Sequence, residues 1–249
     1  MGIITKSERE IVIMRQAGKI VGEVLVLLKS RVQPGMKTVE LNVIAEQEVK
    51  KLGGIPSFKN YRGYPASLCV SINDEIVHGI PGPRFIKEGD VVSLDFGAIY
   101  GGFQGDAAVT VGVGKISVAA AKLIDATAGA LKEGIKAARA GARLGDVSHS
   151  IQQYAESRGF SIVREYTGHG IGRNMHEDPL IPNYGQSGTG LILRKGMTLA
   201  LEPMLNIGGW QTKIDDDDWT VRTLDGSLSA HFEHTIAVTD DVAEVLTAI

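Results

Sequence analysis

Four carboxylates and one imidazole stand in short apolar or glycine-rich stretches of this chain, and they constrain its structure more than any other feature. They are Asp95, Asp106, His169, Glu202 and Glu233. An isolated ionised carboxylate loses many kcal/mol of hydration in a low-dielectric interior, so such groups are buried only when positive charge lies among them. A pair of divalent cations would supply that charge. The pattern therefore predicts a buried site for metal ions.

The composition sets limits on what kind of protein carries this site. The chain has 249 residues, of which 43% are hydrophobic, which is enough for a continuous core. We expect one catalytic domain over residues 1–249. The formal charge of −3, with scattered Lys and Arg, predicts no specific nucleic-acid binding. No apolar run approaches the roughly 20 residues that span a bilayer, and the single cysteine, Cys69, agrees with a cytoplasmic location.

Helix and strand patterns alternate along the chain without a linker. Ser7 and Glu10 have the spacing of a capping box. Apolar residues then recur at helical intervals, and the expected helices cover residues 7–32, 38–52, 117–140 and 146–158. Strand signals occupy 67–72 and 91–96, and strands and turns dominate after Phe160. Two helices followed by acidic strands occur once in each half, which suggests a pseudo-duplicated fold with the site between the halves.

The first acidic motif consists of VVSLDFG, a glycine-rich turn and GDAAVT, which is the order of a β-hairpin. Side chains alternate along a strand, so Asp95 shares a face with Ser93, while Asp106 shares one with Ala108 and Thr110. If the two strands pair, both aspartates can project from the same face. Two such carboxylates repel each other unless cations hold them. The alternative is a pair of aspartates that flank turns and cap loops.

The second motif, TGHGIG, places His169 between two glycines. Glycine permits unusual backbone angles and lets other groups approach the imidazole closely, as a metal or ligand would. The alternative is a surface loop in which the histidine merely tolerates a left-handed conformation.

The last two acidic residues interrupt apolar segments. Glu202 ends the run TLALE and is followed by Pro203, which stops a regular strand ladder. Glu233 lies in AHFEHTIAV and shares a strand face with His231 and Thr235. The alternative for each glutamate is a solvated position on an edge strand.

Charge and ligand type narrow the chemistry of the site. Four carboxylates balance two divalent cations, and an oxygen-rich set with one imidazole suits Mn, Fe or Co, with Zn also possible. Neither CxxC nor HExxH spacing competes with this set. Two metals about 3.5–4 Å apart can activate water and polarise a carbonyl, which is the arrangement for metal-assisted hydrolysis.

At this point the ordered motifs resemble a known family over nearly the whole chain, the type I methionine aminopeptidases. The motifs are SINDEIVHGIP, SLDFG, GDAAVT, TGHGIG, LALEP and HFEHTIAVT. The resemblance implies the α+β pita-bread fold, with pseudo-two-fold halves and a curved antiparallel sheet backed by helices. It also implies five metal ligands. Asp106 and Glu233 would bridge both metals, Asp95 would hold the second, and His169 with Glu202 would hold the first.

The resemblance assigns further residues to catalysis and substrate binding. His78 and His176 would contact the scissile peptide and its tetrahedral intermediate, and Glu202 would shuttle a proton. The methionine side chain would enter an apolar pocket matched here by Tyr61, Tyr64, Cys69, Met175, Trp219 and Phe232. The alternative for each pocket residue is ordinary core packing.

The implied activity is removal of the initiator methionine from nascent proteins and peptides, with a small second residue preferred, by hydroxide activated at the two metals. The implied partners are nascent chains and the ribosome, and the implied state is a monomer. The alternative function is a catalytically inactive pita-bread module that only binds peptides or proteins. Such a module would be expected to have lost ligands, whereas all five are present.

Three features depart from the family pattern. Gln104 stands where many relatives have histidine, and Met175 stands where an aromatic residue is common. We expect both to affect the rim of the pocket. Residues 215–218 form an acidic run, for which the simplest interpretation is a solvated loop.

Overall fold

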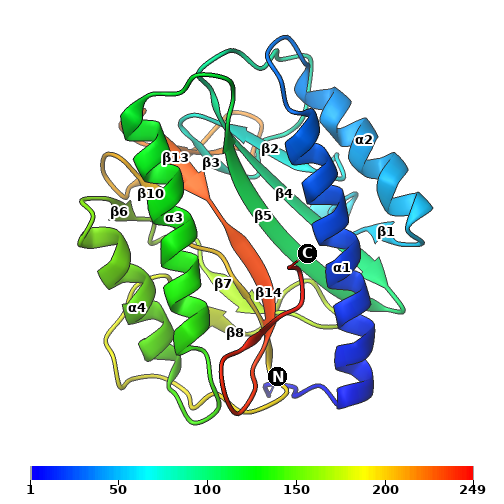
Figure 1. Cartoon of the computed structure of the whole chain (residues 1–249), viewed down its shortest axis with the longest axis vertical. Coiled ribbons are helices and arrows are strands. Elements are labelled where there is room, and N and C mark those ends of the chain that lie inside the picture. Colours follow the sequence, from blue (N-terminus) through cyan, green and yellow to red (C-terminus); the bar gives the residue numbers. More distant parts are fainter. Residues whose placement is uncertain (1, 249) are drawn as a thin grey trace.

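The computed structural model describes residues 2–248, in which four long helices lie against a large twisted antiparallel sheet (Figure 1). The helices are α1 (Glu8–Arg31), α2 (Thr38–Lys51), α3 (Val118–Ala137) and α4 (Leu144–Glu156). No helix within this part of the chain combines the length and the apolar character needed to traverse a membrane.

The helix starts follow from local capping groups. At the start of α1, the Ser7 hydroxyl accepts from the Glu10 amide and the Glu10 carboxylate accepts from the Ser7 amide, which confirms the predicted capping box. Ser117 caps α3 with its hydroxyl alone, which accepts from the amide of Ala120. Helix α4 begins two residues earlier than predicted, because the Asp146 carboxylate accepts from the amide of Arg143 and fixes the first turn there.

The main sheet has nine strands, and its seven-strand path runs β1-β4-β5-β14-β9-β7-β8. Two further strands are β2, which pairs with β4, and β15, which pairs with β14. Their bounds are β1 (Ile55–Pro56), β2 (Cys69–Ile72), β4 (Val91–Tyr100), β5 (Phe103–Gly112), β7 (Gly168–Gly170), β8 (Glu177–Ile181), β9 (Thr198–Leu201), β14 (Glu233–Ala237) and β15 (Glu244–Val245). Every pairing in it is antiparallel.

Two three-stranded sheets complete the strand structure. One has the order β13-β10-β6 and the other β11-β12-β3. Their bounds are β3 (Glu75–Val77), β6 (Ser161–Ile162), β10 (Met204–Asn206), β11 (Thr212–Ile214), β12 (Val221–Thr223) and β13 (Ser229–His231). A short 3₁₀ helix, η1, spans Tyr61–Gly63.

The two halves of the chain meet at the centre of the main sheet, where β5 pairs with β14. Helices α1 and α2 share a core with β4 and β5 of the first half, and α3 and α4 share a core with β9 and β14 of the second. In Figure 1 the blue helices α1 and α2 lie over one half of the sheet, and the green helices α3 and α4 lie over the other half. This arrangement confirms the α+β pita-bread fold with pseudo-two-fold halves.

Two threonine hydroxyls flank the short β5-β14 pairing. The Thr110 hydroxyl accepts from the His231 amide at 2.9 Å and donates to the His231 carbonyl at 2.6 Å. The Thr235 hydroxyl bonds the amide and carbonyl of Asp106 in the same way, at 2.9 and 2.8 Å. Side chains therefore replace the backbone ladder on both sides of the Glu233–Ala108 pair, and they fix the backbones that carry functional groups.

Strand alternation separates the core from the acidic residues. Leu94, Phe96 and Ala107 belong to the core under α1 and α2. Asp95 and Asp106 alternate with them and therefore project from the opposite face of the sheet. The sheet thus presents its carboxylates away from the helices.

Candidate metal centre

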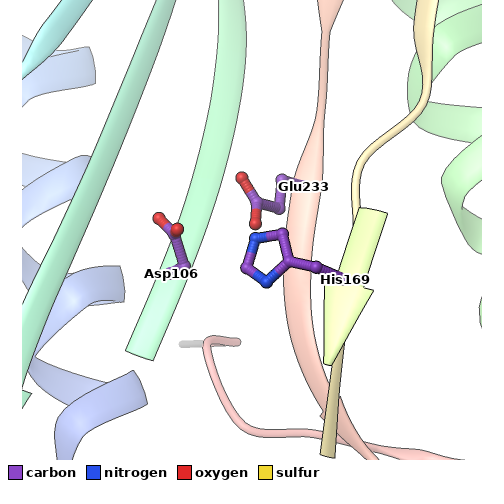
Figure 2. Close-up of side chains that lie close together, drawn as sticks. All are labelled: Asp106, His169 and Glu233. Carbon is purple, nitrogen blue, oxygen red and sulfur yellow. The ribbon is translucent and has the colours of Figure 1, made fainter. Parts of the chain in front are cut away.

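The strand register brings the predicted ligands together. In the β4-β5 hairpin Asp95 pairs with Ala108, and Asp106 pairs with Gly97, so the two aspartates lie diagonally on one face. On the neighbouring strand, Glu233 also pairs with Ala108. Ligand atoms of Asp106, Glu233 and His169 all lie within 4.8 Å of one another, and Figure 2 shows the three side chains converging from three strands.

The alternative interpretations of these residues are wrong. Asp95 and Asp106 lie within long strands and not at turns. Glu233 begins β14, which lies between β5 and β9 and is not an edge strand. His169 lies in β7 and is only 3% exposed, so it does not occupy a surface loop.

Glu202 directly follows the last residue of β9, as the position of Pro203 predicts. Its carbonyl accepts from the Asn183 side chain at 3.0 Å. Its Oε1 lies 3.6 Å from Nε2 of His169. The fourth carboxylate therefore lies at the edge of the same cluster, next to the imidazole.

Several carboxylate oxygens in this cluster are buried without a hydrogen-bond partner among the described residues. They are Oδ1 of Asp95, Oδ1 of Asp106 and Oε1 of Glu233. Burial raises the pKa of Asp95 to about 7. The pKa values of Asp106 and Glu233 are raised well above their usual range, first by burial and then by the neighbouring carboxylates. Buried acceptors without donors are what divalent cations satisfy, so this donor set fits metal ions.

The orientation of His169 suits the same purpose. Its Nδ1 lies 2.8 Å from the Gly170 carbonyl, so the Nδ1 hydrogen is donated there and Nε2 keeps a free lone pair. Burial lowers the pKa of His169 to about 3, which keeps the ring neutral. A neutral imidazole whose other nitrogen is bound to a carbonyl is the usual form of a metal-ligating histidine.

A cavity of about 150 Å³ lies over the carboxylates. It is lined by all five predicted ligands, by both predicted catalytic histidines and by five of the six predicted pocket residues, namely Tyr61, Tyr64, Cys69, Met175 and Trp219. Phe58 and Arg62 also line it and were not predicted. Their signal in the sequence was the short spacing to Tyr61 and Tyr64, since all four lie within residues 58–64, the segment that contains η1.

Phe232 does not line this cavity. It borders a separate depression together with Leu25 of α1 and His234. The reason is strand alternation, because a residue next to Glu233 faces the opposite side of the sheet. The predicted placement of Phe232 with the pocket residues is therefore corrected.

The pocket walls are apolar and tightly held. The Tyr64 hydroxyl lies 3.0 Å from the Gly79 carbonyl and 3.2 Å from that of Leu68. Cys69 pairs with Asp95 across β2 and β4. Burial, and then the charge of Asp95, raises the pKa of the Cys69 thiol, so the thiol stays protonated and serves as a wall.

The two histidines predicted to be catalytic, His78 and His176, line the cavity as neutral rings. Burial and the nearby His176 lower the pKa of His78 to about 4. His176 lies at the exposed rim, where partial desolvation and the positive charge of Arg62 lower its pKa. The rings of His176 and His169 lie 4.2 Å apart between centroids. Neutral imidazoles next to a metal centre can donate hydrogen bonds to a substrate.

The three departures from the family pattern, Gln104, Met175 and the acidic run 215–218, lie in different parts of the structure. Met175 lines the cavity, whereas Gln104 lies outside it and accepts a 2.6 Å hydrogen bond from the Ser57 hydroxyl. The acidic run is not simply a solvated loop. Asp215 accepts from Arg222 at 2.5 Å, and Asp217 accepts from the Trp219 amide at 2.9 Å, which fixes the backbone of a pocket residue.

The fold and the cavity together define a class of protein, the metal-dependent hydrolases with a pita-bread fold. The sequence profile of metallopeptidase family M24 matches residues 12–240. The chain therefore belongs to metallopeptidase family M24.

The similarity to individual relatives extends over nearly the whole chain. It is 53% identical to the "Methionine aminopeptidase" of Clostridium acetobutylicum over 246 residues, which is 98% of each chain. It is 50% identical to "Methionine aminopeptidase 1" of Bacillus subtilis, covering 99% of this chain and 100% of the relative. The crystal structure of methionine aminopeptidase from Thermotoga maritima matches with a TM-score of 0.98 and 48% identity, covering 100% of both chains.

A more distant likeness concerns the fold alone. A prolidase from Pyrococcus furiosus matches with a TM-score of 0.80 and 21% identity, and the match covers 99% of this chain but 66% of that one.

Proposed function

We propose that this chain is a methionine aminopeptidase, a metal-dependent hydrolase that removes N-terminal methionine from peptides and nascent proteins. The observation that carries the proposal is the group of unsatisfied carboxylate oxygens beside the floor of a small apolar cavity. The relatives with 50–53% identity over almost their full length, all named methionine aminopeptidase, support it.

We assign Asp95, Asp106, His169, Glu202 and Glu233 as the ligands of two divalent ions. The donor set suits Mn, Fe or Co, and Zn is a further candidate. Such ions, when bound, supply the positive charge that acidifies a water molecule and polarises the scissile carbonyl.

Glu202 is assigned as the proton shuttle. It borders the cavity, and burial together with Asp106 raises its pKa well above the usual value. A carboxylate of raised pKa can accept a proton from water and pass it to the departing amine. Its position at the end of β9, where the regular ladder stops, leaves the side chain beside the substrate space.

His176 and His78 are assigned as donors to the scissile peptide. The Tyr61 hydroxyl lies 2.9 Å from Nδ1 of His176. With this hydroxyl as the donor, the proton of His176 lies on Nε2, where it can be donated to the carbonyl oxygen as negative charge develops. His78 borders the same cavity and contacts Trp219 edge to face, and it is placed to bind the peptide backbone.

The apolar walls define the substrate class. Tyr64, Cys69 and Met175 are buried, and the cavity of about 150 Å³ that they line ends at the carboxylates. A linear, unbranched apolar side chain such as methionine fits such walls, while the free amino group of the substrate would lie near Asp95. We also propose a preference for a small second residue in the substrate.

We further propose that the chain acts as a monomer and as one catalytic domain, since residues of one chain supply all five assigned ligands and both assigned histidines. Cytosolic nascent chains at the ribosome are the natural substrates, because initiator methionine is exposed there. The free Cys69 thiol agrees with that compartment. The alternative of an inactive binding module is disfavoured, because it would not need five intact ligands.

The test is release of methionine from a Met-Gly peptide by chelator-treated protein, with and without added Co, Mn, Fe or Zn. A Met-Leu peptide measures the preference at the second position, and Glu202→Ala is the inactive control. We expect metal-dependent release that the control lacks. A folded sample that binds none of the four metals and releases no methionine would overturn the proposal in favour of a binding module.

A further inference from the structure

One buried histidine near the centre has no role in the mechanism given above. His231, the last residue of β13, is 2% exposed. Neither of its ring nitrogens has a hydrogen-bond partner among the described residues. A buried polar group without a partner costs roughly 1–3 kcal/mol, so an imidazole with two such nitrogens requires an explanation.

The position of this ring is set by its backbone. The Thr110 hydroxyl binds both the amide and the carbonyl of His231. On the other side, His231 pairs with Met204 of β10. The backbone of His231 is therefore held from two directions, which fixes the point from which the imidazole projects.

The ring faces one particular carboxylate. His231 and Glu233 are two residues apart and project to the same side, and Nε2 of His231 lies 3.9 Å from Oε2 of Glu233. The other oxygen, Oε1, is one of the buried atoms without a partner. A shift of about 1 Å brings the Nε2–Oε2 pair to the usual hydrogen-bond distance.

We propose that His231 positions Glu233 for metal binding by donating its Nε2 hydrogen to Oε2 of that carboxylate. The donation fixes the rotation of the carboxylate and leaves the remaining lone pairs for cations. The inference rests on the proposed metal-dependent function, and it makes His231 a positioning residue, because the ring does not border the cavity. Outer partners of this kind are worth about 10- to 100-fold in metal affinity.

Two substitutions can each replace one nitrogen of the His231 ring, and together they form a matched pair of variants. The side-chain amide of glutamine reaches the place of Nε2, whereas that of asparagine reaches the place of Nδ1. We would compare His231→Gln with His231→Asn, and add His231→Leu, which has no donor. Affinity for Mn²⁺ would be measured by titration calorimetry on chelator-treated protein, and the geometry by the visible absorption of the Co²⁺ form. Unfolding midpoints of the metal-free variants would report on their folding.

We expect His231→Asn and His231→Leu to weaken Mn²⁺ binding about 10- to 100-fold and to change the Co²⁺ spectrum. His231→Gln should retain most of the affinity. If His231→Leu fails to fold, the Gln and Asn pair carries the comparison alone. Equal affinity in Gln and Asn variants would overturn the inference while leaving the proposed function in place. Absence of metal binding by the unaltered protein would overturn both.

Discussion

The phenol oxygen of Tyr61 lies 2.9 Å from Nδ1 of His176, and the two rings stack with their planes 12° apart. The stacking fixes the ring plane of a histidine that is otherwise exposed at the rim. With the hydroxyl as the donor to Nδ1, the His176 proton lies on Nε2, which is the donor that the proposed reaction needs.

Tyr61→Phe should therefore lower kcat/KM for a Met-Gly peptide about five- to tenfold, which corresponds to one hydrogen bond of roughly 1 kcal/mol. Affinity for metal should not change. Tyr64→Phe is the matched control, because it removes a phenol from the same cavity whose oxygen contacts carbonyls and not a histidine. Equal losses in both variants would contradict a specific role for Tyr61.

The carboxylate cluster predicts how pH acts on the metal-free protein. The folded pKa of Asp95 is raised to about 7, and those of Asp106 and Glu233 are also raised well above their usual range. The folded state therefore binds these protons more tightly than the unfolded chain, whose carboxyls titrate near about 4. The stabilising contribution is complete below about pH 4 and is lost as pH rises toward the folded pKa values.

We expect the free energy of unfolding contributed by these groups to fall between pH 5 and pH 7, and Asp106→Asn to reduce that fall. Urea unfolding of chelator-treated protein at both pH values measures it. Metal affinity should change in the opposite direction and increase with pH, because cations compete with the same protons. An Asp106→Asn variant that loses stability with pH more steeply than the unaltered chain would refute this account.

An ion pair secures the segment that carries His176. Nζ of Lys6 lies 2.5 Å from Oε2 of Glu177, and the two side chains are only 5% and 10% exposed. Lys6→Ala should lower the free energy of unfolding by about 3 kcal/mol, because it leaves a nearly buried charge without its partner. Thermal unfolding measures the loss.

The double variant Lys6→Ala with Glu177→Gln removes both charges, keeps the same packing change at position 6 and is the control. It should be more stable than Lys6→Ala alone. A double variant that is less stable than the single one would show that the loss comes from packing and not from an unpaired charge.

The cysteine in the cavity should behave as a wall and not as a nucleophile. Because the pKa of the Cys69 thiol is raised, iodoacetamide should modify it slowly in the folded protein and readily in urea. Cys69→Ala should keep metal-dependent release of methionine and change mainly KM. Loss of kcat in a variant that still binds metal would contradict this assignment.

Local patterns in the sequence were sufficient for most elements and for part of the centre. Capping groups and apolar spacing predict α1 and α2 because both signals act within a few residues. The shared face of Asp95 and Asp106 follows from one hairpin. The contact between β5 and β14 does not, since Asp106 and the Thr235 hydroxyl that binds it are 129 residues apart. Helical and strand periodicity in the sequence is local, so it cannot predict a contact between residues so far apart.

The incorrect placement of Phe232 has a local origin. Phe232 was assigned by family resemblance to the pocket, although its neighbour Glu233 must face the other side of the strand. By the same alternation, His231 shares the face of Glu233 and could have been added to the site. Which of these side chains meets a neighbour depends on the twist and register of distant strands, and these are fixed only when the halves pack together.

The threonine pairs at the β5-β14 junction make the metal centre a property of both halves of the chain. Thr110 and Asp106 belong to the first half, whereas His231 and Thr235 belong to the second. A first half folded by itself would hold two aspartates but neither the imidazole nor the glutamates. The complete ligand set therefore exists only while the two halves are docked, and a bound cation would stabilise the docked arrangement over any state in which the halves separate.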